Sequence, residues 1–164
     1  MSTRSMIAVM HGNKAKAVYC HWDGYLAHNG AILNKYYDSV KANKLVAMGD
    51  LSSLGMDIGE QHDFGRTPVY VEDEEIQVSM SPDCTFYGRD RGEEGTEFKT
   101  FQSLSEMLSH AQGSWCEYAY ILKGNEWFYT KRSTIEDANA EDGYIVEWTP
   151  LEFLSAALKT KEAV

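Results

Sequence analysis

The chain has 164 residues, of which 43% are hydrophobic and 12% aromatic, and it carries a formal net charge of −10. This composition is typical of a folded protein, and the lack of clustered Lys and Arg argues against general nucleic-acid binding. The sequence has no apolar run long enough for a membrane span, no signal-peptide pattern and three widely spaced cysteines. We therefore expect a single compact domain over residues 1–164, in a reducing cytoplasm.

The first predicted elements form a β-hairpin. Residues 5–11 alternate, with Ile7 and Val9 on one face, and residues 16–23 resume the alternation after a turn at Gly12. Two strands joined by a short Gly/Asn loop are typical of a hairpin.

A helix is predicted next. Apolar residues recur at helical spacing over residues 32–40, and Asn29 precedes them as a candidate N-cap. The pattern indicates a break near Asp38 and a stop at Gly49. Residues 50–67 are rich in turn formers, which predicts a loop.

The middle of the chain alternates between short strands and polar turns. Residues 69–71 and 76–78 have the apolar character of strands and flank an acidic turn. Residues 88–95 combine three glycines with charged side chains, and this composition predicts a loop.

The pattern over residues 103–106 is a capping box, which marks the start of a second helix. An apolar face runs from there to Ala111, and Gly113 is expected to end the helix. Residues 114–122 and 126–131 then alternate across a Gly/Asn turn and predict a second hairpin.

The end of the chain is predicted to be a strand over residues 144–148 and a terminal helix. Thr149 opens a second capping box with Pro150 at the first helical position, and the helix would bury Leu151, Leu154 and Leu158. Strand pairs and separate helices predict an α+β domain, with an antiparallel β-sheet built from hairpins and about three helices packed on one face.

The densest side-chain chemistry lies at the end of the second predicted strand. If residues 16–23 form a strand, Tyr19, His21 and Asp23 share one face of it. An Asp that accepts a hydrogen bond from a His fixes its tautomer, as in many acid–base and metal sites. The same pair also occurs as a plain structural bond. We favour the structural role and keep the functional one as an alternative.

The opposite face of the same strand is apolar and consists of Val18, Cys20 and Trp22. This face is expected to point into the core. Cys20 would then be a buried thiol turned away from His21, so a catalytic Cys–His pair is not expected. The remaining histidines and acidic residues show no recognised metal-ligand spacing, and no cofactor motif occurs.

Two arginines in the predicted loop over residues 88–95 form a candidate anion site. Guanidinium groups clasp phosphate through two hydrogen bonds, so Arg89 and Arg91 could hold an anionic ligand. The alternative, which we favour, is that both arginines pair with acidic residues of the same loop.

Several strings of the first third of the chain carry a resemblance. They are TRS at residues 3–5, KAVYCHWDGY at 16–25, NG at 29–30 and GDLSSLG at 49–55. With these strings the chain resembles a group of small uncharacterised proteins of tailed phages and prophages. The resemblance implies a setting, the cytoplasm of a bacterial host, and it implies no mechanism. Small accessory proteins in that setting often act against host defence, by occupying a host protein or by sequestering a nucleotide signal.

We therefore expect a binding protein rather than an enzyme, with a host protein or a small nucleotide-like ligand as its partner and self-association as a possibility. The expected contact residues are a strand-end cluster and an anion clamp, namely Tyr19, His21, Asp23, Tyr25, Arg89 and Arg91. Two alternatives stay open. One is a small hydrolase or metal-dependent enzyme that uses His21 and Asp23, and the other is an acidic decoy of a nucleic-acid-binding groove.

Overall fold

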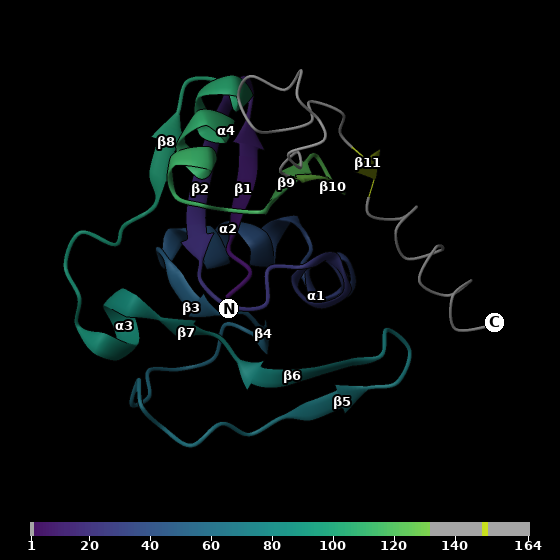
Figure 1. Ribbon diagram of the computed structural model, residues 1–164, viewed down its shortest axis with the longest axis vertical. Helices are drawn as coiled ribbons and strands as arrows, with labels where there is room; N and C mark the ends of the chain where they lie inside the picture. The colour runs from purple at the N-terminus through teal and green to yellow at the C-terminus, as the bar shows by residue number, and fades with distance from the viewer. Residues whose placement is uncertain (1, 132–148, 151–164) are drawn as a thin grey trace.

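The computed structural model describes residues 2–131 together with Thr149 and Pro150. Most of the strands form one main sheet (Figure 1). In spatial order its strands are β11 (Thr149–Pro150), β10 (Glu126–Lys131), β9 (Tyr118–Lys123), β1 (Ser5–His11), β2 (Lys14–Cys20), β3 (Leu51–Ser53) and β7 (Thr85–Phe86). A further short strand, β8 (Lys99–Phe101), pairs with the first half of β2.

Both predicted hairpins are present in the main sheet. β1 pairs antiparallel with β2, and β9 pairs antiparallel with β10. The sheet as a whole is mixed, however, because β9 runs parallel to β1 and β3 runs parallel to β2. Each of these strands follows a helix, and a helical connection lets a strand enter the sheet in the same direction as its neighbour. The α+β class is confirmed, and the purely antiparallel sheet was a wrong prediction.

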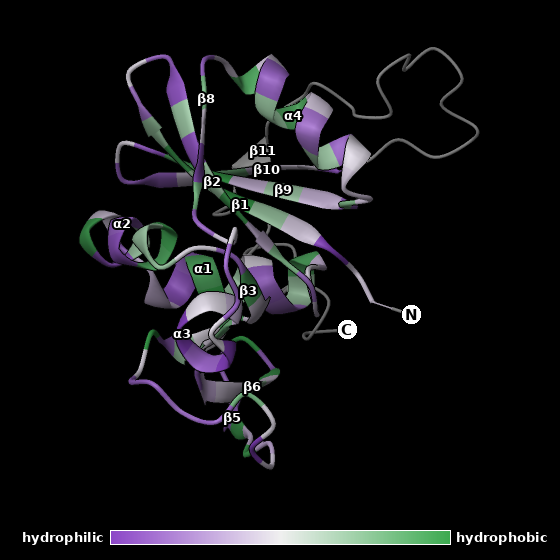
Figure 2. Cartoon of the chain, turned by 90° about the vertical axis from the view of Figure 1, so that its left-hand side faces the viewer, coloured by the Kyte–Doolittle hydropathy of each residue, from purple (hydrophilic) through white to green (hydrophobic). Residues whose placement is uncertain are grey.

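Helices cover both faces of the main sheet, not one as predicted (Figure 2). Helix α4 (Leu104–Gly113) lies on one face, and helices α1 (Ala31–Tyr36) and α2 (Ser39–Ala47) lie on the other. The physical reason is visible in β1, whose two faces are both apolar. Ile7 and Val9 join the core cluster of α1 and α2, whereas Met6 and Ala8 join the cluster of α4. A strand without a polar face must be covered on both sides.

A second, smaller sheet lies on the far side of α1 from the main sheet (Figures 1 and 2). It consists of β4 (Gly55–Asp57), β6 (Val78–Asp83) and β5 (Val71–Asp73), with β6 in the middle. Met80 of β6 joins Ile32 of α1 in one buried cluster. The loop predicted over residues 50–67 is therefore wrong for β3 and β4. Both strands have only three residues, too few for an alternating pattern to be visible in the sequence.

Some of the predicted helix caps and ends are confirmed, and one predicted cap is wrong. Ser103 caps α4 by accepting a hydrogen bond from the Glu106 amide, and α4 ends at Gly113 as expected. The break at Asp38 is also confirmed, since Asp38 caps α2. Asn29 is not an N-cap, because it lies inside η1 (Leu26–Gly30), a single π-helical turn that runs directly into α1.

Three predicted segments are shifted. The strand expected over residues 76–78 begins at Val78 and continues to Asp83 as β6. The strand expected over residues 69–71 begins only at Val71, because Tyr70 and the residue before it are exposed and unpaired with a sheet. The loop expected over residues 88–95 starts as a short helix, α3 (Tyr87–Arg91), and only its second half is irregular. A left-handed Gly92 ends α3, which explains why a glycine-rich string can follow a helical turn.

Near the end of the chain, the structure describes Thr149 and Pro150. Thr149 and Pro150, expected to open the terminal helix, instead form β11 beside β10. The predicted strand over residues 144–148 and the helix of Leu151, Leu154 and Leu158 lie outside the described residues. Within the described part of the chain, every helix is too short or too polar to cross a lipid bilayer.

Asp73, at the end of β5, joins the small sheet to α1. One carboxylate oxygen accepts hydrogen bonds from Lys35, at 2.6 Å, and from the Tyr36 hydroxyl. The other oxygen accepts from the amides of Glu75 and Ile76 at 3.0 and 3.2 Å. This one carboxylate therefore fixes both the β5–β6 turn and the position of the turn against α1.

Replacing Asp73 by Asn is expected to lower the free energy of unfolding near neutral pH by about 1–3 kcal/mol. Burial raises the pKa of Asp73, but the hydrogen bonds from Lys35 and Tyr36 outweigh it and lower the pKa from 3.8 to about 2. The stabilisation is thus complete above the unfolded pKa and is lost as the pH falls through about 2. Urea unfolding at about pH 6 and about pH 2 checks this. An equal difference between wild type and Asp73→Asn at both pH values would contradict the role of the charge.

Candidate functional site

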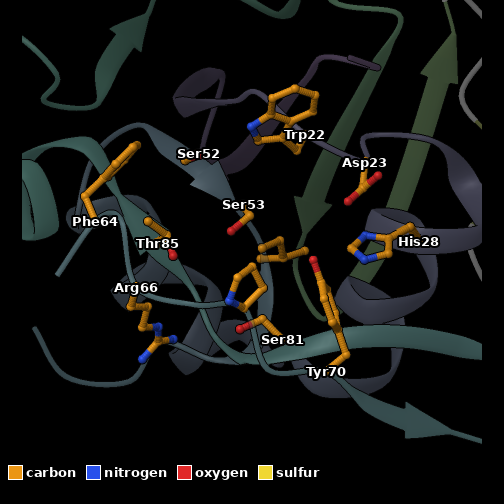
Figure 3. Close-up of a pocket in the computed structure, with 12 residues that line it drawn as sticks. Trp22, Asp23, His28, Ser52, Ser53, Phe64, Arg66, Tyr70, Ser81 and Thr85 are labelled. Atoms are coloured by element: carbon orange, nitrogen blue, oxygen red, sulfur yellow. The ribbon is translucent and has the colours of Figure 1, made fainter. Parts of the chain in front are cut away.

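A pocket of about 340 Å³ opens where the end of β3 faces the small sheet (Figure 3). Five stretches of chain form it: the turn after β2, η1, the end of β3, the segment between β4 and β5, and the β6–β7 region. Its volume lies at the lower end of the range for small-molecule sites.

The first wall comes from the turn after β2, which departs from the predicted strand. β2 ends at Cys20, and the amides of His21 and Trp22 instead donate to the carbonyls of Leu51 and Ser52 in β3. The backbone of the next residue, Asp23, then takes a left-handed conformation with φ of 56°. The strand prediction was wrong here because pairing with β3 turns the chain out of β2. Trp22 is consequently 47% exposed rather than part of the core.

Gly24 locks this turn in place. Its amide donates to the Thr3 carbonyl at 2.8 Å, and its carbonyl accepts from the buried Tyr120 hydroxyl at 2.6 Å. A Cβ at this position would lie 2.8 Å from the Cβ of Ser5, so only glycine fits between the turn and β1. Asp23, which lines the pocket, is thereby held between the segment that precedes β1 and Tyr120 of β9.

His28 of η1 also lines the pocket, and the buried Asn29 orients it. The Asn29 amide nitrogen donates to the Trp22 carbonyl at 3.5 Å and to the Ser5 hydroxyl at 3.3 Å. Because a carbonyl only accepts, the Asn29 side-chain oxygen is left to face His28 Nδ1, 2.9 Å away. His28 Nδ1 is then the donor, and Nε2 of the neutral ring is a hydrogen-bond acceptor.

The second wall is the segment that joins β4 to β5. It contributes two aromatic rings, a cation and a proline, namely Phe64, Tyr70, Arg66 and Pro68. Arg66 lies 3.7 Å from the Asp83 carboxylate, and both side chains are about one-third exposed. An ion pair this open is weak, so the guanidinium remains available to a ligand.

A buried ionic cluster anchors the start of this segment. Arg89 donates to the carbonyls of Ile58 and Gly59 at 3.0 and 2.8 Å and to Asp90 at 2.9 Å. The Asp90 side chain is fully buried and also accepts from the amides of His62 and Phe86. Burial raises the pKa of Asp90, but these hydrogen bonds outweigh it and hold the pKa below its usual value. We call Arg89, Asp90 and His62 the loop anchor.

Arg89 therefore does not form the candidate anion clamp, and the favoured alternative, pairing with acidic residues of the same loop, is confirmed. Its guanidinium is used by backbone carbonyls and by Asp90, so it belongs to the loop anchor. Arg91 is exposed, lies 3.9 Å from a Glu93 carboxylate oxygen and stacks over the Phe64 ring at 5.2 Å. Arg91 thus lies behind a pocket residue, and the arginine that lines the pocket is Arg66.

Hydroxyl groups and the Leu54 side chain form the remaining surface of the pocket. The hydroxyl groups come from the end of β3 and from the β6–β7 region, and they belong to Ser52, Ser53, Ser81 and Thr85 (Figure 3). A hydroxyl can donate and accept, so this surface can meet either kind of polar group on a ligand.

The structure separates the predicted strand-end cluster into three parts. Tyr19 and His21 share a hydrogen bond of 2.7 Å between the Tyr19 hydroxyl and His21 Nδ1. Asp23 lines the pocket, and the Tyr25 ring packs on His28 with ring centres 5.9 Å apart. The left-handed turn at Asp23 removes the basis for the predicted His21–Asp23 pair, since the two side chains no longer share a strand face.

The Tyr19–His21 pair has a defined protonation at neutral pH. Burial raises the pKa of Tyr19 to about 12 and lowers the pKa of His21. The tyrosine is therefore the donor and the neutral imidazole the acceptor. This pairing leaves His21 Nδ1 engaged, which weakens the case for His21 as an acid–base residue.

The three cysteines are buried, and their thiols have low reactivity. Burial raises the pKa of Cys20 and of Cys116 to about 12 and that of Cys84 to about 11. These thiols are protonated at neutral pH, so they are poor nucleophiles. The expectation that Cys20 is a buried thiol is confirmed. Among residues 2–131, moreover, the side chains of His, Cys, Asp and Glu form no group of three that could hold a metal ion.

Sequence reasoning missed most of the pocket. His28, the β3 serines and the aromatic and basic residues of the β4–β5 segment were not singled out. The one signal that pointed to β3 was the string GDLSSLG, which contains Ser52 and Ser53. Comparison with family models, with curated proteins and with solved structures found no match to this chain.

Proposed function

We propose that this chain is a binding protein that takes up a small nucleotide-like ligand in the pocket beside β3. The observation that carries the proposal is the combination of three aromatic rings, a set of hydroxyls and one available guanidinium around a single cavity. The rings belong to Trp22, Phe64 and Tyr70, and the guanidinium belongs to Arg66. A nucleotide has the matching parts, since it joins an aromatic base to a polar sugar and an anionic phosphate.

The aromatic rings supply the affinity in this proposal. Trp22 is 47% exposed and Tyr70 is 63% exposed, although large aromatic side chains are usually well buried. Stacking on a base would cover these rings, and such stacking contributes about 1–3 kcal/mol per base. Exposed rings that flank a pocket are thus better explained by a ligand than by the stability of the fold.

Binding has more support than catalysis. The enzyme alternative uses His21 together with Asp23, and His21 is hydrogen-bonded to Tyr19 instead. The decoy alternative needs only surface charge and gives the pocket no role. Following the resemblance to phage proteins, we place the activity in the host cytoplasm, where sequestering a nucleotide signal would act against host defence. A host protein as partner becomes the favoured alternative if no nucleotide binds.

A pair of tryptophan variants tests the proposal. Calorimetric titration with a panel of nucleoside mono-, di- and triphosphates and cyclic nucleotides is expected to give binding heat for at least one of them. Trp22→Ala should weaken that binding about 5–150-fold, the equivalent of losing one stacked ring. Trp115→Ala, which removes an exposed ring outside the pocket, should leave the affinity unchanged. Absence of binding heat for the whole panel would overturn the proposal.

A further inference from the structure

We infer that the ligand is a nucleoside monophosphate that presents two neighbouring hydrogen-bond donors to Asp23 and its phosphate to Arg66. The inference rests on the proposed function and narrows its ligand class. Guanine has such a donor pair on its base edge, and the ribose 2′,3′-diol offers a second one. Either source matches the same chemistry at Asp23.

Hydrogen-bond acceptors lie on one side of the pocket, and the cationic donor lies on the other. In Figure 3 Asp23 and His28 lie on one side of the pocket and Arg66 lies on the opposite side. The first side offers acceptors, because the Asp23 carboxylate only accepts and His28 Nε2 accepts in the neutral ring. The second side offers the donors of a guanidinium. A bound molecule must therefore carry donors at one end and an anion at the other.

A carboxylate discriminates among the nucleobases. Guanine presents its N1–H and its exocyclic amino group side by side, so both oxygens of Asp23 can accept at once. Adenine places an acceptor nitrogen next to its amino group, and that lone pair would face the carboxylate unfavourably. Asp23 thus favours guanine over adenine if it contacts the base, and favours ribose over deoxyribose if it contacts the sugar.

The backbone holds Asp23 ready for this contact. Its φ of 56° lies in the left-handed region, which Asp and Asn adopt more readily than most residues other than glycine. Gly24 fixes the turn through Thr3 and Tyr120. The carboxylate is therefore presented without a prior rearrangement, which favours a directional contact over a general charge effect.

The charge of the pocket limits the number of phosphates. Of the described residues that line it, Arg66 is the one with a permanent positive charge, and Asp83 neutralises part of it. The chain as a whole has a net charge of −10. A single phosphate can be clasped by the Arg66 guanidinium, whereas further phosphates would meet no second Lys or Arg among the described residues that line the pocket. The pocket volume of about 340 Å³ also suits a mononucleotide.

Calorimetry with GMP, 2′-deoxy-GMP, AMP and GTP tests the inference on wild type, Asp23→Asn and Arg66→Gln. Asn also tolerates the left-handed conformation, so the Asp23→Asn turn should keep its fold. We expect Asp23→Asn and Arg66→Gln each to weaken GMP binding about 5–150-fold. GTP should bind more weakly than GMP. If AMP binds more weakly than GMP, Asp23 contacts the base. If 2′-deoxy-GMP binds more weakly than GMP, Asp23 contacts the sugar.

Two control variants remove the same charges elsewhere. Asp38→Asn keeps a good N-cap for α2, and Lys44→Gln removes a positive charge from the last turn of α2, outside the pocket lining. Both should bind GMP like wild type. The inference is overturned if Asp23→Asn leaves every affinity unchanged, or if GTP binds more tightly than GMP. Nucleotide binding that depends on Trp22 and not on Asp23 would keep the proposed function and reject this inference, whereas absence of all binding would reject both.

Discussion

Replacing Asp90 by Ala is expected to lower the free energy of unfolding by about 3–5 kcal/mol, the typical cost of removing one partner of a buried ion pair. The Asp90 side chain is fully buried, and the Arg89 side chain is 12% exposed. The substitution leaves the Arg89 charge without its partner and the amides of His62 and Phe86 without an acceptor. Urea unfolding measured by circular dichroism checks this value.

Two further variants show whether the loss comes from the loop anchor. Arg91→Ala changes an exposed neighbour and should cost less than about 1 kcal/mol. The double variant Arg89→Ala/Asp90→Ala should lose less than the two single variants together, because it leaves no buried charge unpaired. If the double variant loses as much stability as the two single variants together, the ion pair is not the source of the stabilisation. Any nucleotide affinity should also fall in Asp90→Ala, since the segment that carries Phe64 begins at the loop anchor.

The second large effect is expected at Gly49, between α2 and β3. Gly49 has φ of +90°, and a Cβ there would overlap the carbonyl oxygen of Thr96. That carbonyl cannot move freely, because it accepts the Asp50 amide at 2.8 Å. Gly49→Ala should therefore cost about 2–4 kcal/mol through backbone strain and overpacking together. Thermal or urea unfolding of the variant measures the loss.

Gly95→Ala separates the two causes at Gly49. Gly95 also has a positive φ, of +78°, but a Cβ there meets no other atom within 4 Å. Its substitution should cost only the left-handed conformation, about 1 kcal/mol. Equal losses for Gly49→Ala and Gly95→Ala would show that the close approach to Thr96 has no energetic role.

The elements that the sequence predicts well are those whose signals are local. The two hairpins, the Ser103 cap and the stops at Gly49 and Gly113 are each marked by residues that lie close together in the sequence. The errors lie where distant segments decide the structure. The end of β2 leaves its partner because β3 captures the amides of His21 and Trp22, and nothing in the local pattern announces this pairing.

The candidate site was predictable only in part for the same reason. Asp23 was selected from the sequence for its chemistry, and it does line the pocket. Its expected partner His21 was wrong because the turn changes the alternation after Cys20. Arg89 was chosen as an anion clamp by its residue type, but tertiary contacts consume its donors. Arg66 could not be selected from the sequence, because the segment that carries it comes close to β3 only in the folded chain.

Indole N–H signals in a two-dimensional ¹⁵N NMR spectrum test the central claim most directly. Trp22 lines the pocket, whereas the Trp127 indole is buried and donates to the Tyr37 carbonyl at 2.9 Å. On titration with GMP, the account predicts that the Trp22 signal, assigned by its disappearance in Trp22→Phe, moves saturably. The Trp127 signal should stay in place. An unmoved Trp22 signal at millimolar GMP, or equal shifts of both indoles, would contradict nucleotide binding in this pocket.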